Sequence, residues 1–424
     1  MHAADDRPLD LAIERLTYGP DALAHHEGRV VFVPFAAPGD RVRARVVERR
    51  RGFLRAEMTD VMQAGPARVE PHCPFFGRCG GCQWQHVAPA AQRAAKAALV
   101  AEQLGRLGGL RDVDVRPARA ATDAWSYRSR ITLVAEGRRL GFHRARSHAL
   151  VEIDACAIAD PVLVGHLAVA RAWAAAIRGA PLRVTLACAP GGVVLAATLR
   201  AAPGEVDVVA TERLLADTAS VRGAVLTGGA TRLVVGDPCV RVPVEPDLVL
   251  EVPADAFTQV HPAANLLVVA TLLELGGFRA GDRALDLYCG AGNFTLPLAR
   301  RAVDVVGVER SPVAVAAARA NAARLGLGGA RFTCDTVAAA LARLPAAPLD
   351  AVVLDPPRTG APDAVGALAT RRAARVLYVS CDPATLARDA RTLVAGGYRI
   401  GRVQPLDVFP QTYHVETVAE FVLT

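Results

Sequence analysis

The chain has 424 residues, 52% of them hydrophobic, which is enough to fill two or three globular cores. No run reaches the ~18 apolar residues of a membrane-spanning helix, and the first ten residues carry acids instead of a signal-peptide core. These patterns predict a soluble, cytoplasmic protein that does not bind a membrane. The net charge of +7 favours a polyanionic partner. Lys96 is the only lysine, so 48 of the 49 basic residues are arginine, which also indicates a general codon bias.

The first 64 residues are expected to form a small β-barrel domain. Residues 9–62 alternate apolar and polar side chains in short runs, for example over 41–47. Turn sequences that contain glycine and proline separate these runs. Short strands at this spacing are typical of a small closed sheet.

Three cysteines cluster just after this domain. Cys73, Cys79 and Cys82 lie close together in a glycine-containing segment, a spacing that indicates a metal site in a reducing compartment. An iron–sulfur cluster uses four thiolates and tolerates wide spacing, and Cys156 is the best candidate for the fourth. A zinc site is the alternative.

The remaining chain divides into two further units. Residues 65–260 are expected to form a mixed α+β central domain that carries the metal site, with a helix over 89–107. From 261 to 424 apolar strands alternate with alanine-rich helices, which predicts an α/β fold with a Rossmann-like, doubly wound parallel sheet. The strands are expected at residues 283–288, 303–309, 349–355, 375–381 and 417–424.

A glycine-rich turn follows the first strand of the doubly wound unit. Gly290 and Gly292 would let the backbone approach a ligand where a strand ends and a helix begins. Glu309 ends the next strand, where an acid binds ribose hydroxyls. Thr295 occupies the position of the third glycine that a dinucleotide pyrophosphate needs. The pattern therefore favours S-adenosylmethionine over NAD.

Reactive side chains lie at other strand ends. Asp355 precedes two prolines, which hold it in extended backbone, and then Arg358, where exocyclic-amine methyltransferases have an aromatic residue. Cys381 ends a strand, and Asp382 is the expected N-cap of the following helix. The helix dipole is expected to lower the pKa of the Cys381 thiol and make it a nucleophile. Glu416, just before the last strand, matters if it folds back beside Cys381.

Together these residues resemble the RNA uracil-5 methyltransferase family, which makes 5-methyluridine in transfer and ribosomal RNA. The string Ser-Cys-x-Pro-Ala-Thr-Leu at 380–386 and the four-cysteine pattern carry the resemblance, which extends over nearly the whole chain. It implies that residues 9–62 are a TRAM module and that the four cysteines hold a 4Fe–4S cluster. It implies Cys381 as nucleophile, Glu416 as general base, and cofactor-site positions at Gln259, Tyr288, Asn293, Glu309, Asp335 and Asp355. The chain departs from the family at Asp382, where asparagine is more frequent, and a carboxylate there is expected to raise the thiol pKa.

The resemblance implies methyl transfer from S-adenosylmethionine to C5 of a uridine after the cysteine thiolate has added to C6. A uridine of 23S ribosomal RNA is the expected substrate, with a transfer RNA uridine as the alternative, and the base must flip out of its stack. We expect a monomer. Candidates for phosphate contacts are Arg128, Arg130, Arg144 and Arg146. Cytosine-C5 RNA methylation, an iron–sulfur oxidoreductase with a nucleotide cofactor, and a non-catalytic RNA-binding protein remain alternatives.

Overall fold

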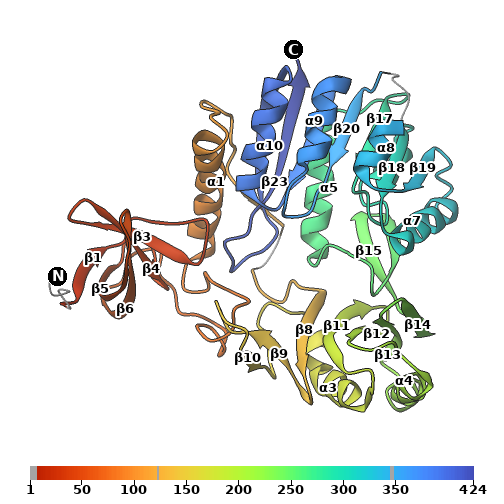
Figure 1. Ribbon diagram of the computed structural model, residues 1–424, viewed down its shortest axis with the longest axis horizontal. Helices are drawn as coiled ribbons and strands as arrows, with labels where there is room; N and C mark the ends of the chain where they lie inside the picture. The colour runs from red at the N-terminus through yellow and green to blue at the C-terminus, as the bar shows by residue number, and fades with distance from the viewer. Residues whose placement is uncertain (1–6, 122–123, 344–347) are drawn as a thin grey trace.

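The computed structural model describes residues 7–121, 124–343 and 348–424. The described strands form a six-stranded sheet, a seven-stranded sheet, a two-stranded sheet and an eight-stranded sheet. The six-stranded sheet lies at one end of the molecule, at the left in Figure 1. Among the helices of the described ranges, none is long and apolar enough to cross a membrane.

The first sheet is the small barrel that the alternating pattern predicts. Its strands are β1 (Leu9–Ala12), β2 (Arg15–Leu16), β3 (Asp21–His26), β4 (Arg29–Pro34), β5 (Arg41–Arg49) and β6 (Phe53–Gln63), in the spatial order β1-β5-β6-β4-β3-β2. Val42 and Ala44 of β5 are fully buried, whereas the arginines between and beside them are exposed. This period of two is what places one face of a strand in the core.

The second sheet lies in the middle of the chain. Its strands are β8 (Arg130–Glu136), β9 (Arg139–His143), β10 (Leu150–Glu152), β11 (Pro181–Ala189), β12 (Gly192–Leu199), β13 (Val221–Gly228) and β14 (Thr231–Gly236). The short helices α2 (Pro161–Gly165), α3 (Leu167–Ala176) and α4 (Glu205–Asp217) pack against it. Trp173 of α3 is 2% exposed and belongs to the core between the helices and this sheet. A hairpin of β15 (Cys239–Glu245) and β16 (Leu248–Pro253) then leads to the C-terminal part.

The C-terminal part is an eight-stranded sheet with helices on both faces. Its order is β19-β18-β17-β20-β21-β23-β22-β7. The strands are β17 (Arg283–Leu287), β18 (Asp304–Glu309), β19 (Ala330–Cys334), β20 (Ala351–Leu354), β21 (Arg375–Ser380), β22 (Tyr398–Asp407), β23 (Glu416–Leu423) and β7 (Arg119–Ala120). The helices are α5 (Pro262–Gly276), α6 (Thr295–Arg300), α7 (Pro312–Arg324), α8 (Val337–Arg343), α9 (Pro362–Arg371) and α10 (Pro383–Ala395). The predicted Rossmann-like, doubly wound architecture is confirmed.

The last strand differs from the expectation. It was expected to be parallel, but β23 runs antiparallel to both β21 and β22. The reason is its short connection: residues 408–415 link β22 directly to β23, and only antiparallel neighbours can be joined by so short a segment. As a consequence β23 begins at the edge of the sheet where β21 ends, with Ser380 opposite Thr417.

Part of the middle segment packs on the C-terminal sheet. Helix α1 (Pro89–Arg106), at the place predicted for a helix, contacts α10 and β22, and β7 pairs with β22 at the sheet edge. In Figure 1, α1 stands between the barrel and α10. This helix therefore connects the N-terminal third of the chain to the edge of the sheet where β23 begins.

Candidate active site

The two side chains predicted for catalysis, Cys381 and Glu416, lie at one edge of the C-terminal sheet with Asp355, which was predicted for the cofactor site. Cys381 follows β21, Asp355 follows the neighbouring β20, and Glu416 opens β23. The β20–β21 and β21–β23 pairings place these strand ends side by side. Glu416, 3% exposed, therefore does fold back beside Cys381, and its carboxyl group interacts electrostatically with that thiol.

The environment of Cys381 reverses the expected direction of its pKa. The thiol is half-buried, and burial, together with the nearby carboxylates of Glu416 and Asp355, raises its pKa to about 12. Asp382 adds a smaller effect of the same sign, and Arg358 opposes them. The predicted lowering by the helix dipole is wrong for the protein without ligands, because desolvation and neighbouring negative charges outweigh one helix N-terminus.

Glu416 lies in an acidic, desolvated environment. Burial and the carboxylate of Asp355 raise its pKa well above the ordinary value, while Arg358 acts in the opposite direction. Burial also raises the pKa of Asp355 to about 7. Arg358 donates a hydrogen bond of 3.2 Å to Nε2 of His414, and burial lowers the pKa of that imidazole to about 3. A carboxyl group with a raised pKa is suited to accept a proton near neutrality.

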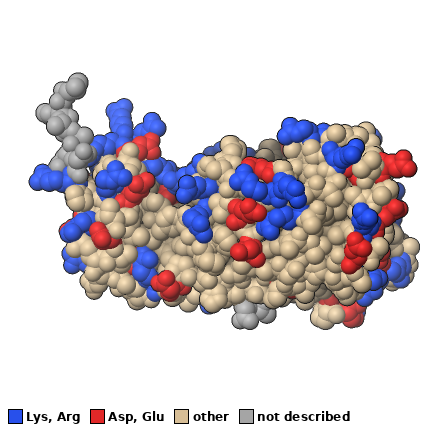
Figure 2. Space-filling model, turned by 90° about the horizontal axis from the view of Figure 1, so that it is seen from below, with Lys and Arg blue, Asp and Glu red and all other residues tan. Residues whose placement is uncertain are grey.

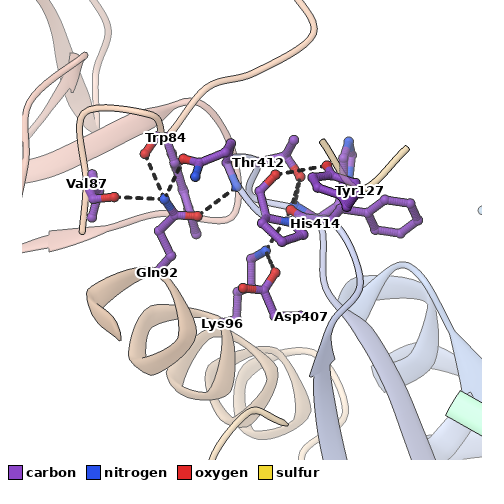
Figure 3. A network of polar contacts seen from close by, with 11 residues as sticks. Trp84, Val87, Gln92, Lys96, Tyr127, Asp407, Thr412 and His414 are labelled. Atoms are coloured by element: carbon purple, nitrogen blue, oxygen red, sulfur yellow. Dashed lines mark hydrogen bonds and ion pairs between the residues drawn. The ribbon is translucent and has the colours of Figure 1, made fainter. Parts of the chain in front are cut away.

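Helix α1 holds the segment 408–415 that leads into Glu416 (Figure 3). The Gln92 amide donates to Oε1 of Gln411 at 2.9 Å, and its oxygen accepts the Gln411 backbone N–H at 2.9 Å. Lys96, fully buried, donates to Asp407 at 2.5 Å and to the Phe409 carbonyl at 3.0 Å. No residue pattern in the sequence predicted this network. The one available signal was that Lys96 is the single lysine of an arginine-rich chain.

The turn after β17 has the backbone conformation that glycine allows. Gly290 and Gly292 have φ of 54° and 96°, and Tyr288 also lies in the left-handed region with φ of 68°. Asp286 at the end of β17 is 0% exposed, accepts a hydrogen bond of 2.5 Å from Thr295, and has its pKa raised by burial to about 7. Such a turn brings backbone N–H groups close to a ligand without side chains in between.

The other predicted cofactor residues line the same edge of the sheet. Glu309 ends β18, and its carboxylate accepts the Gly290 N–H at 3.3 Å and the Ser311 N–H at 2.8 Å. Asn293 forms a reciprocal pair of amide hydrogen bonds with Asn265 of α5, at 2.9 and 3.1 Å. Asp335 follows β19 and forms an ion pair with Arg343. Asn265, which braces Asn293, had no signal in the sequence.

Gln259 lies in a segment fixed by the partly buried Arg130. The Arg130 guanidinium donates to the carbonyls of Ala254 and Ala256 and to the Thr258 hydroxyl, so it serves this segment and not phosphate. The neighbouring Phe257 is 75% exposed. An aromatic ring in this setting is available for stacking on a base.

Of the other three arginines proposed for phosphate contacts, one forms an ion pair within the protein, one lines an internal pocket and one is exposed. Arg146 donates to both carboxylate oxygens of Asp21 in the barrel, at 2.7 and 2.8 Å. Arg128 lines the pocket of the predicted metal cysteines, and its Nε is buried without a hydrogen-bond partner among the residues that the structure describes. Arg144 is exposed. On the face shown in Figure 2, basic side chains are interspersed with acidic ones, and many of them lie on the barrel end.

The four predicted metal cysteines line one cavity of about 70 Å³. Cys73, Cys79, Cys82 and Cys156 share it with Arg128 and with apolar side chains of the middle sheet. Burial raises the pKa of Cys79 and Cys156, and that of Cys82 to about 12. Within the described ranges, no three Cys, His, Asp or Glu side chains converge on a point that would hold a metal ion as they stand.

Comparison with known proteins decides the family. Residues 243–421 match the model described as tRNA (Uracil-5-)-methyltransferase, and residues 8–59 match the TRAM domain. A 23S rRNA (uracil(1939)-C(5))-methyltransferase RlmD of Alkalilimnicola ehrlichii is 37% identical over 98% of this chain and 96% of its own length. The protein of that name from Thiobacillus denitrificans is 36% identical over 94% of this chain and 96% of its own length.

This chain belongs to the family of S-adenosylmethionine-dependent RNA (uracil-C5)-methyltransferases. Its fold is also that of a solved member. The crystal structure of Pyrococcus abyssi tRNA (uracil-54, C5)-methyltransferase, in complex with S-adenosyl-L-homocysteine, superposes with a TM-score of 0.73. The match covers 98% of this chain and 100% of that one at 23% identity, so at this identity it supports the fold and not the substrate.

Proposed function

We propose that this methyltransferase modifies C5 of a uridine in 23S ribosomal RNA, with Cys381 as nucleophile and Glu416 as general base. The observation that carries the proposal is the antiparallel β23, which brings a buried carboxyl group to the end of the strand that presents the cysteine. The ribosomal target rests on the full-length relatives that carry the name 23S rRNA (uracil(1939)-C(5))-methyltransferase. A transfer RNA uridine is the second candidate, because the matching C-terminal family model bears that description.

The chemistry requires a thiolate and then a base. The Cys381 thiolate adds to C6 of the uracil, and the electrons of the C5–C6 double bond move to the C4 carbonyl as an enolate. C5 then takes the electrophilic sulfonium methyl group that S-adenosylmethionine would supply, and the methyl–sulfur bond breaks with S-adenosylhomocysteine as the leaving group. Glu416 removes the proton from C5, the double bond re-forms, and the C6–sulfur bond breaks to return the thiolate. We assign Asp355 and Gln259 to contacts with the flipped base or the cofactor, as the family resemblance implies.

The turn after β17 fits S-adenosylmethionine. Tyr288, Gly290, Gly292 and Asn293 would approach its methionine part and adenosine, and the Glu309 carboxylate would bind the ribose hydroxyls. The Glu309 carboxylate accepts the Gly290 backbone N–H, so it is already oriented toward the turn at which the ribose would lie. We assign Asp335, after β19, to the adenine end of the cofactor.

Glu416→Gln is expected to trap the reaction after methyl transfer. Glutamine keeps the size and hydrogen-bonding oxygen of the side chain but does not remove the C5 proton, so the bond between Cys381 and C6 persists. We expect a protein–RNA adduct that survives denaturing electrophoresis and a loss of turnover of roughly a hundredfold or more. Glu420→Gln on the same strand, whose carboxylate pairs with Arg402, is the control and should turn over normally. Rapid turnover without adduct in the Glu416 variant would exclude it as the base.

We further propose that Cys73, Cys79, Cys82 and Cys156 hold a 4Fe–4S cluster. Four thiols around one cavity match the ligand number of such a cluster, which spaces its ligands around a group several ångströms across. The buried Arg128 Nε at the cavity wall would donate to a sulfur atom of the cluster. With all four iron positions filled by thiolates, the group would stabilise the fold around it and would leave the methyl transfer to the C-terminal sheet.

Protein purified without oxygen is expected to contain iron and acid-labile sulfide in equal amounts and to show iron–sulfur absorption. Cys82→Ser should lose most of both and should unfold at a lower temperature, because the ligand binds the folded state. Cys239→Ser, outside this cavity, is the matched control. One equivalent of zinc without sulfide would instead assign a zinc site.

The target is tested by mapping 5-methyluridine in total RNA. Deletion of the gene should remove one 5-methyluridine from 23S ribosomal RNA, and the purified protein should restore it on that RNA in vitro. Mass spectrometry separates this product from 5-methylcytidine. Loss of a transfer RNA 5-methyluridine with intact ribosomal RNA would assign the second candidate.

A further inference from the structure

A tyrosine of the N-terminal barrel reaches the residue next to the proposed nucleophile. Tyr18 lies in the turn between β2 and β3, and its hydroxyl donates a hydrogen bond of 3.0 Å to Oδ2 of Asp382. Its ring packs edge-on against Tyr413, with 5.6 Å between the centroids. Tyr413 in turn lies 4.2 Å from the ring of His414. The barrel thus contacts both the segment after β21 and the segment before β23.

The turn that carries Tyr18 is held firmly in place. The Thr17 hydroxyl donates to the Asp21 carbonyl at 2.6 Å, and the Gly19 N–H donates to the Thr17 carbonyl at 2.7 Å. Asp21, 5% exposed, binds Arg55 of the barrel and Arg146 of the middle domain. Because the turn is already ordered, little further conformational entropy is lost when Tyr18 binds Asp382. A change in the position of the barrel would therefore move Asp382 as well.

Each oxygen of the Asp382 carboxylate has its own role. Oδ1 accepts the backbone N–H groups of Ala384 and Thr385 and so caps α10. Oδ2 accepts the Tyr18 hydroxyl, which comes from 364 residues earlier in the chain. An asparagine at 382 would cap the helix equally well but would present an amide donor instead of a second negative oxygen. The Tyr18 hydroxyl thus has a carboxylate acceptor because this chain has aspartate at 382, where asparagine is more frequent in the family.

We propose that Tyr18 is a positioning residue of the active site, which holds Asp382 and with it the Cys381 nucleophile, so that docking of the barrel controls the methyl-transfer step. The proposal rests on the assignment of Cys381 as nucleophile. The charged groups that face Cys381 come from three elements: Glu416 from β23, Asp355 and Arg358 from the segment after β20, and Asp382 beside the thiol. Burial and the Asp382 carboxylate raise the pKa of Tyr18, so its hydroxyl remains a donor at any working pH.

The test is Tyr18→Phe in the full-length holoprotein, which removes one oxygen atom and keeps the ring contact with Tyr413. We expect the single-turnover methylation rate at saturating RNA to fall roughly three- to tenfold, because a hydrogen bond to a charged group beside the nucleophile is lost. The affinity for the same RNA, measured with S-adenosylhomocysteine present, should not change. Alkylation of Cys381 by iodoacetamide, followed on its peptide by mass spectrometry, should slow in parallel, and this readout needs neither RNA nor methyl donor.

A double-mutant cycle separates positioning from general stability. In an Asp382→Asn background the tyrosine no longer serves a carboxylate, so Tyr18→Phe should there cost less than about twofold in rate. Tyr398→Phe is the matched control, since that hydroxyl donates to the Ala373 carbonyl far from the site. It should leave the Cys381 alkylation rate unchanged even if it lowers the melting temperature.

Three outcomes would overturn the proposal: an unchanged rate in Tyr18→Phe, an equal cost in both backgrounds, or a loss confined to RNA affinity. The last would make Tyr18 an RNA contact. Each of these leaves the proposed reaction intact as long as Cys381→Ala is inactive. Methylation by Cys381→Ala would instead remove the reaction assignment itself, so the two failures are distinguishable.

Discussion

Cys381→Ala is expected to abolish 5-methyluridine formation, with a fall in rate of roughly a thousandfold or more, because without addition at C6 the C5 carbon is a poor nucleophile. S-adenosylmethionine should still bind, because its proposed site is built from other residues after β17 and β18. The variant should fold normally, since a half-buried cysteine that becomes alanine costs only about 1 kcal/mol. The measurement is tritium transfer from labelled methyl donor to RNA, with thermal unfolding in parallel.

Cys188→Ala is the matched control for this variant. Cys188 lies in β11 of the middle sheet, is half-buried like Cys381, and also has its thiol pKa raised by burial to about 12. It should methylate at the normal rate. The pH profile adds a second check, because burial raises the pKa of both Cys381 and Glu416 and both must be deprotonated to act. The wild-type rate should therefore rise as the pH increases from 6 to about 9.

Lys96→Met is expected to destabilise the protein by about 3–5 kcal/mol, since it leaves the Asp407 carboxylate buried without its cation. The Lys96 ammonium is fully buried, 2.5 Å from Asp407 and 3.0 Å from the Phe409 carbonyl, with the Trp84 ring 5.9 Å away (Figure 3). Its pKa is lowered by burial, which Asp407 opposes. Urea unfolding, monitored by the fluorescence of the buried tryptophans, would measure the loss.

The paired variant Lys96→Met with Asp407→Asn distinguishes the unpaired charge from lost packing. It should recover a large part of the stability, because no charge then remains buried. It should not fully recover the methylation rate, because the Phe409 carbonyl and the loop before Glu416 still lack their donor. A Lys96→Met protein within about 1 kcal/mol of wild type would show that the ion pair is not what holds this loop.

Local sequence patterns predicted the helices and strands well, because these elements depend on short-range periodicity of apolar residues. The period-two alternation over 41–47 is the barrel strand β5, and helix α1 ends one residue from its expected end. The Gly290 turn and the strand ending at Ser380 likewise lie where glycine and apolar runs indicated. The direction of the last strand was wrong, because an apolar run reads the same in a parallel and an antiparallel sheet.

The sequence alone made Cys381, the turn at Gly290 and the cysteine group Cys73, Cys79, Cys82 and Cys156 candidates, because each has a residue type or a spacing with its own chemistry. Glu416 became a candidate base through the family resemblance, and the roles of all these residues stay predictions. What only the tertiary structure decided is how these groups affect one another. The antiparallel β23 places Glu416 beside the thiol, burial raises a pKa that the helix dipole alone would lower, and Lys96 and Tyr18 reach the site from the N-terminal third of the chain. Desolvation and long-range hydrogen bonds depend on which distant segments pack together, and no local pattern of residues encodes that.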